Sequence, residues 1–161
     1  MAARFFINGG VDSNWSSISN WSTTSGGAGG AAVPTAADDV TFDAAGNVNC
    51  ILDTATAKLA NTLTTTAGYT QTLTFNVNLT VDAGVTLNTG VTFAGAGSLI
   101  ITGGTITSNG KVININTVFG ASATLADDLN VSGDLTFGTA TSSGSITVYT
   151  NTIFASGNVY L

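Results

Sequence analysis

Short apolar triplets alternate with small polar turns along the second half of the chain. From Leu79 onward, groups such as LTV (79–81), LII (99–101) and TVF (117–119) follow one another, separated by Gly, Asn, Asp and Ser. In most triplets the first and third residues are apolar, which is the period-two alternation of a strand with one buried face. Thr, Val and Ile lose side-chain freedom in a helix, and Gly recurs throughout, so we expect strands.

Three-residue strands are too short to be stable as separate hairpins, and this favours an architecture that stacks them. In a β-solenoid each triplet pairs with its equivalent in the coils above and below, so that short strands build long parallel sheets. Three triplets per coil give roughly 20 residues per turn, and residues 79–161 would then form about four coils. The sequence therefore predicts an all-β fold, a right-handed parallel β-helix-like solenoid, with an antiparallel β-sandwich as the alternative.

The first part of the chain differs from the rest. Residues 1–43 hold both tryptophans, the only proline and the Gly-rich run 25–32. Residues 40–78 carry two further pairs of strand-like segments, which can be early coils or a hairpin lid over the N-terminal end of the solenoid. We therefore divide the chain into an N-terminal attachment head with a Gly-rich loop, residues 1–43, and a β-solenoid body, residues 44–161.

Aromatic residues are the most distinctive side chains of the head. Trp15 and Trp21 occur in identical NWS contexts. Both indoles can fill a small core beneath the head loop, or one can anchor an interface, because Trp is enriched among binding hot spots; a platform for a sugar is a third interpretation. As candidate interface anchors we take Phe5, Phe6, Trp15 and Trp21.

The composition narrows the possible chemistry. The 161 residues include nine acidic and three basic side chains and no His, for a net charge of −6. Without His there is no imidazole base or metal ligand, and without Glu a catalytic acid-base pair must be two Asp. Cys50 lies between apolar residues and is expected to be buried. The pairs Asp38-Asp39 and Asp127-Asp128 can bind Ca²⁺, but turn caps fit them better. We expect no enzyme, no metal and no cofactor.

The charge also limits the partners. Phosphate binding needs a basic face, so a net charge of −6 disfavours nucleic acid and an anionic membrane surface as partners. No stretch reaches the ~18 apolar residues of a membrane span. The N-terminus lacks the apolar region of a signal peptide. We therefore expect synthesis in a cytoplasm, with no nucleic acid and no membrane as partner.

A resemblance adds to these inferences. The segment RFFINGGVDSNWSSISNWSTTSGGAGGAAVPTAADDVTFDAAG combines an Arg-aromatic pair, Gly-Gly, two Trp-Ser pairs, a Gly-rich run, Val-Pro, Asp-Asp-Val and Phe-Asp. This string, about a quarter of the chain, resembles a module of bacteriophage virion structural proteins and of some large repetitive surface proteins of bacteria. The resemblance implies a non-enzymatic structural protein located in the virion, either a capsid decoration (cement) protein or a short head fibre.

The resemblance also implies partners. The head would dock on other virion proteins, the major capsid protein first among them. We expect a homo-oligomer, with a homotrimer as the candidate form, because the chain ends on the apolar strand NVYL without a polar cap. The alternative is a tail-fibre or tailspike segment, or an adaptor, that recognises a host-surface glycan. A glycan depolymerase is disfavoured because the body holds few carboxylates, and an adhesin repeat because no secretion signal is apparent.

Overall fold

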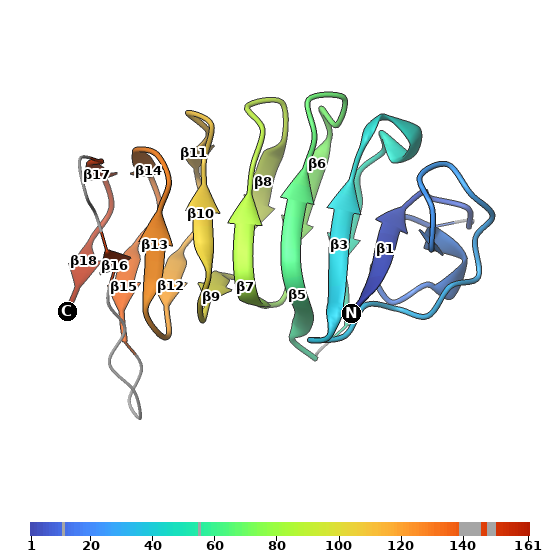
Figure 1. Cartoon of the computed structure of the whole chain (residues 1–161), viewed down its shortest axis with the longest axis horizontal. Coiled ribbons are helices and arrows are strands. Elements are labelled where there is room, and N and C mark those ends of the chain that lie inside the picture. The colour runs from blue at the N-terminus through green and yellow to red at the C-terminus, as the bar shows by residue number, and fades with distance from the viewer. Residues whose placement is uncertain (11, 55, 139–145, 148–150) are drawn as a thin grey trace.

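The chain winds into a β-solenoid of about five turns, in a computed structural model that describes residues 1–10, 12–54, 56–138, 146–147 and 151–161 (Figure 1). Strands account for 44% of the structure and helix for 4%. In Figure 1 the chain rises along the front strands, crosses to the back at the top and descends there, while each coil lies further to the left, so that the winding is right-handed. The predicted solenoid is confirmed, and the parallel pairing of successive coils excludes the antiparallel sandwich.

One large sheet runs the length of the solenoid. Its main path follows the order β18 (Val159–Tyr160), β15 (Leu135–Phe137), β12 (Thr117–Phe119), β9 (Leu99–Ile101), β7 (Leu79–Thr86), β5 (Lys58–Thr65), β3 (Asp38–Phe42), β1 (Ala2–Phe6) and β2 (Trp21–Ser22). A branch that pairs with the second half of β7 contains β10 (Thr105–Thr107), β13 (Ala123–Leu125) and β16 (Ile146–Thr147). The long strands β5 and β7 thus each form two sides of their coils. In the later coils, two short strands form the same two sides.

Two three-stranded sheets form the remaining side. The first contains β4 (Cys50–Leu52), β6 (Thr72–Phe75) and β8 (Thr92–Gly95), and the second contains β11 (Val112–Ile113), β14 (Leu129–Val131) and β17 (Ile153–Ala155). Two short 3₁₀ helices complete the elements, η1 (Ile18–Asn20) and η2 (Ala44–Gly46). Each coil therefore has three sides, as the three triplets per coil predicted.

The coils have unequal lengths. Inter-coil hydrogen bonds at one corner join residues 20 positions apart (Asn78 and Ser98), 18 apart (Asn116 and Asp134) and 24 apart (Asp134 and Asn158). Parallel pairing of β3 with β5 and of β4 with β6 makes the segment 40–78 a set of early coils and not a hairpin lid. The estimate of roughly 20 residues per turn is close to these spans.

Inward-facing residues form straight columns along the solenoid axis. Val40, Leu63, Val85, Ile106 and Leu125 stand opposite one another in successive coils, and all of them are buried. Each such side chain contributes about 1.5–3 kcal/mol through burial. The period-two pattern is preserved along this column although the coils differ in length, and a register shift between Ala60 and Thr62 of β5 accommodates an extra residue of β7.

Polar residues form a second column, at the corner that precedes β7, β9, β12, β15 and β18. The Asn78 side chain accepts a hydrogen bond from the backbone N–H of Ser98 (2.9 Å), Asn116 accepts one from Asp134 (3.0 Å), and Asp134 accepts one from Asn158 (3.0 Å). A corner cannot use the regular strand ladder for these N–H groups, so the side chains of the preceding coil satisfy them. We call Asn78, Ser98, Asn116, Asp134 and Asn158 the corner ladder.

The head is continuous with the body. Strand β3 pairs in parallel with β1 on one side and with β5 on the other, and the buried residues form one core cluster. The boundary placed at residue 43 therefore falls inside one sheet. Residues 1–43 are the first rung of the solenoid together with the loop that covers its N-terminal end.

Candidate interaction surfaces

Three aromatic side chains close the N-terminal end of the core. Phe6, Trp15 and Trp21 have no exposed surface. The Trp21 ring lies edge-on to Trp15, with centroids 4.8 Å apart, and to Phe6, at 5.4 Å, and its Nε1–H donates to the Trp15 carbonyl oxygen at 2.6 Å. Phe42 of β3 packs beneath them. These rings occupy the place that the next coil would otherwise fill.

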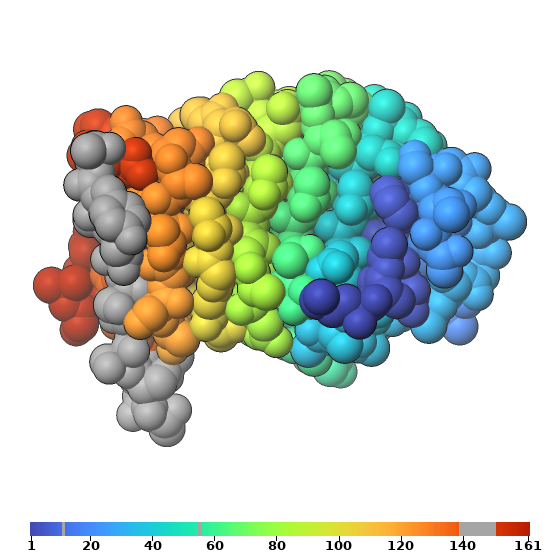
Figure 2. Space-filling model, in the orientation of Figure 1, coloured from blue at the N-terminus to red at the C-terminus, as the bar shows by residue number. Residues whose placement is uncertain are grey.

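The same segment covers the backbone at that end. Strand β2 pairs antiparallel with β1, and the Asn14–Ile51 bridge places the loop beside β4. Trp15 N–H donates to the Ile51 carbonyl at 2.8 Å, and Ile51 N–H donates to the Ser13 carbonyl at 2.8 Å. In Figure 2 the loop, in blue, forms the right-hand end of the molecule. Residues 7–37 are thus an N-terminal cap of the kind that protects solenoid ends.

These observations correct the anchor hypothesis for three of its four residues. Phe6, Trp15 and Trp21 have no exposed surface that a partner could contact, because they are buried in the core beneath the cap. Phe5 points to the opposite face of β1 and stays partly exposed next to Thr41. Direct anchoring by Phe5 remains a prediction, and the other three side chains act by holding the cap in place.

A carboxylate joins the cap to the first full coil. Asp53 accepts hydrogen bonds from the backbone N–H of Ser16 (2.9 Å) and from the Ser16 hydroxyl, and lies 3.8 Å from the Lys58 ammonium. Burial raises the pKa of Asp53, but the Ser16 hydrogen bonds and the Lys58 charge outweigh it and hold that pKa below its ordinary value. The ionised carboxylate therefore stabilises the cap.

Replacing Asp53 by Asn is expected to lower the free energy of unfolding at neutral pH by about 1.5–3 kcal/mol, the range for hydrogen bonds to a charged group. Because the folded-state pKa lies below the unfolded value of about 3.9, this contribution is complete above that pH and is lost as the pH falls through the folded pKa. Urea titrations from pH 3 to 7 should show the two curves converging in acid. An equal deficit at all pH values, or one matched by the exposed Asp82→Asn control, would contradict this role.

The other carboxylates also serve the fold. All nine accept at least one hydrogen bond from within the chain: Asp12, Asp38, Asp39, Asp43, Asp53, Asp82, Asp127, Asp128 and Asp134. Asp38 caps the turn at Thr35, as predicted, whereas Asp127 and Asp128 accept hydrogen bonds from the N–H groups of Ser108 and Thr152 and so join one coil to the next. The described residues contain no group of three or more His, Cys, Asp or Glu that could hold a metal ion.

The single thiol and the helices add no further site. Cys50 is buried in β4, and this burial raises the pKa of its thiol well above the ordinary value, so it lies within the core as expected. No helix in the described part of the chain is long and apolar enough to cross a bilayer.

The C-terminal coil exposes apolar side chains. Among the residues that the structure describes, half of the large exposed hydrophobic side chains belong to it, namely Phe154 (53% exposed), Val159 (51%), Tyr160 (50%) and Leu161 (99%). Val159 stands above the buried Leu135 and points into the core, so its exposure means that nothing described covers this end. The exposed apolar surface includes the predicted strand NVYL and extends to Phe154 of β17.

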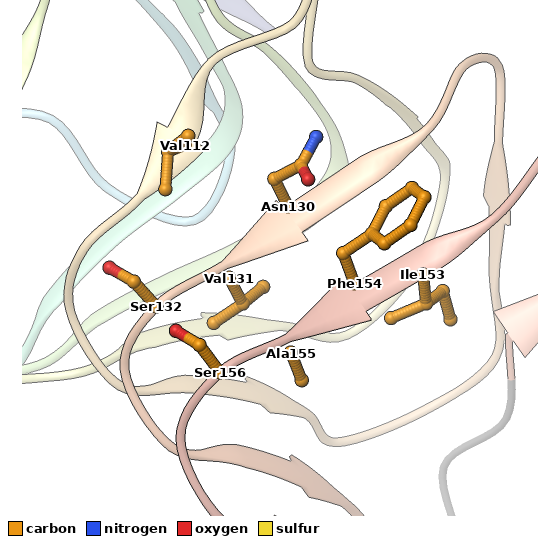
Figure 3. A pocket seen from close by; sticks show the side chains of 8 residues that line it. All are labelled: Val112, Asn130, Val131, Ser132, Ile153, Phe154, Ala155 and Ser156. Atoms are coloured by element: carbon orange, nitrogen blue, oxygen red, sulfur yellow. The ribbon is translucent and has the colours of Figure 1, made fainter.

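An open groove lies on the outer face of the sheet that contains β11, β14 and β17 (Figure 3). Val112, Asn130 and Phe154 stand opposite one another in three successive coils, with Asn130 between the two apolar side chains. Ser132 and Ser156 add hydroxyl groups at the strand ends. The lining carries no charge. The sequence pattern did not reveal this groove, because Asn130 and Phe154 lie far apart in the chain.

Comparison with known proteins does not assign the chain to a group: no protein-family profile, no curated protein and no solved structure matches it.

Proposed function

We propose that this chain is a non-enzymatic structural protein of a bacteriophage virion, a capsid decoration (cement) protein or a short head fibre. The observation that carries the proposal is that the polar and aromatic residues of the chain stabilise its own fold. The nine carboxylates accept hydrogen bonds from the chain itself, and the tryptophans close one end of the core. The chain is thus a stable rod with two unlike ends. The resemblance of residues 4–46 to virion structural proteins supports a place for this rod in a virion.

Docking through the N-terminal end is the arrangement that we favour. The major capsid protein is the proposed partner. Two apolar side chains at this end have exposed surface, namely the partly exposed Phe5 of β1 and the exposed Ile18 of the cap. Phe6, Trp15 and Trp21 would keep this surface in shape from below. A homo-oligomer completes the proposal; the homotrimer expected from the sequence is one form that it can take.

Co-sedimentation with tail-free capsid shells of the source phage tests this function. We expect saturable binding with a copy number that matches a symmetry axis of the shell lattice, because a decoration protein recognises a repeated lattice position. The double variant Phe5→Ser, Ile18→Ser should bind at least about tenfold more weakly. Leu59→Ser, an exposed apolar residue outside the cap, is the matched control. Absence of binding to shells would overturn the proposal.

The groove on β11, β14 and β17 favours a second candidate, recognition of a host-surface glycan by a tail-fibre or tailspike segment. An exposed aromatic ring beside an amide and two hydroxyls suits a neutral sugar, whose apolar face stacks on the ring while its hydroxyls find polar partners. Binding to purified host-surface polysaccharide that is lost in Phe154→Ala, with no binding to shells, would establish this candidate instead.

A further inference from the structure

The chain contains two Asn-Gly pairs, Asn8-Gly9 and Asn109-Gly110. In such a pair the backbone nitrogen of the glycine attacks the side-chain carbonyl carbon of the asparagine, ammonia leaves and a succinimide ring forms, which water opens to an aspartate or an isoaspartate. Asparagine is a thermolabile residue. All other asparagines of the chain precede Trp, Val, Cys, Thr, Leu or Ile, whose side chains crowd the attacking nitrogen.

The second pair lies in an open turn between β10 and β11. Lys111 N–H donates to the Ser108 carbonyl at 2.9 Å, and Asn109 and Gly110 have φ of 49° and 75°, as in the primed turns that Asn-Gly favours. Both residues are exposed. Nothing lies within 4 Å of the position that a Cβ of Gly110 would take, so the surroundings leave space for the ring.

The first pair is enclosed by the N-terminal cap. The side-chain oxygen of Asn8 is buried. A Cβ at Gly9 would lie 2.5 Å from the Ser19 carbonyl oxygen and 3.3 Å from the Ile7 side chain. A ring at this place would displace the loop that closes the core. The same two residues therefore stand in one closed and one open environment.

Asn109 joins three successive coils. Its side-chain Nδ2 donates to the Leu87 carbonyl at 2.7 Å, and its backbone N–H donates to the Asp127 carboxylate at 2.5 Å. The attacking nitrogen is held less firmly, because Gly110 N–H donates only to the Ser108 hydroxyl, at 3.2 Å, the long end of the range for such bonds. The atom that would leave as ammonia is thus the one that binds the preceding coil.

We propose that Asn109 is a self-modification site of the folded chain, with Gly110 as its nucleophile and water as the co-reactant. The bond from the Gly110 nitrogen to the Asn109 side-chain carbon forms, and the bond from that carbon to Nδ2 breaks. The proton of the Gly110 N–H leaves with Nδ2 as ammonia. Water then adds to one of the two ring carbonyls, and no electrons are transferred to another group.

The reaction reverses the contacts of this turn. A carboxylate in place of the Asn109 amide cannot donate to the Leu87 carbonyl, and it brings a second negative charge beside Asp127. An isoaspartate also adds one carbon to the backbone between β10 and β11. The modification therefore loosens the stacking of these coils irreversibly. It is independent of capsid docking, because the turn lies outside the cap.

Peptide mapping by mass spectrometry tests the proposal. The folded full-length chain is kept at mildly alkaline pH and digested in acid at intervals, and isoaspartyl methyltransferase labels the isoaspartate product. We expect Asn109 to react at least about tenfold faster than Asn8. In concentrated urea the two pairs should react at similar rates, since the fold creates the difference. Asn109→Gln should abolish the reaction at this turn, because the longer side chain closes a ring far more slowly.

Urea unfolding of the aged protein measures the consequence. Its midpoint should fall to that of the Asn109→Asp variant, while the aged Asn109→Gln variant keeps the midpoint that it had when fresh. Equal rates at Asn8 and Asn109 in the folded chain, or a folded-state rate at Asn109 that is slowed as strongly as that at Asn8, would overturn the proposed site. An unchanged midpoint after complete modification would show that the turn does not hold the coils together.

Discussion

Replacing Trp21 by Ala is expected to lower the free energy of unfolding by about 3–5 kcal/mol, the range for removing a buried aromatic side chain. Trp21 has no exposed surface and contacts the rings of Phe6, Trp15 and Phe42 at once. Its indole N–H also holds the Trp15 carbonyl at 2.6 Å. The substitution therefore opens a cavity at the very end of the core and releases the segment that covers the edges of β1 and β4.

Urea unfolding followed by circular dichroism measures this loss, and Ile18→Ala provides the control. Ile18 belongs to the same loop but is 56% exposed, so its truncation should change the stability by about 0.5 kcal/mol or less. Because the cap also protects strand edges, the Trp21 variant should aggregate at concentrations where the control stays soluble. Equal stability of the two variants would show that the tryptophan does not seal the core.

The sequence alone could not decide whether Trp15 and Trp21 are interface anchors or parts of a cap. The spacing of Trp15 and Trp21 identified an unusual segment, but a buried indole and an interface indole carry the same local signature. Their burial depends on Phe42, and on Ile51 in β4, which lie well downstream. Only the parallel stacking of β1 on β3 brings these partners beneath the head loop.

The strands themselves could be predicted from the sequence. Buried and exposed residues alternate along a strand with period two, and this local pattern does not depend on which strand lies beside it. LII at 99–101, TVF at 117–119 and LTF at 135–137 are strands with the bounds that the triplets gave, whereas TLA at 124–126 is displaced by one residue, to β13. The predicted triplet ITV at 146–148 extends beyond the described residues of β16. The corner ladder is not apparent from composition, because Asn, Ser and Asp are also common in ordinary turns. A polar residue directly before each of β7, β9, β12, β15 and β18, repeated every 18 to 24 residues, is the signal that identifies it.

Replacing Gly104 by Ala is expected to be the most costly substitution in the corners. Gly104 lies at the bend between β9 and β10 with φ of 78°, and an added Cβ would overlap the carbonyl group of Ala83 in the adjacent coil. The carbonyl oxygen of Gly104 also accepts the Thr124 N–H at 2.9 Å, so the bend is held from both sides and has little room to move. Left-handed strain and backbone overlap together should cost about 2–5 kcal/mol.

Gly110 separates these two contributions. Its φ of 75° is nearly the same, but nothing lies within 4 Å of the position that its Cβ would take. Gly110→Ala should therefore cost only the left-handed strain, about 1–2 kcal/mol. Urea midpoints of the two variants, measured side by side, give the part of the loss that comes from stacking one coil on the next. If the two losses were equal, the close approach of coils at Gly104 would contribute nothing to the stability of the solenoid, and backbone conformation alone would explain the glycine.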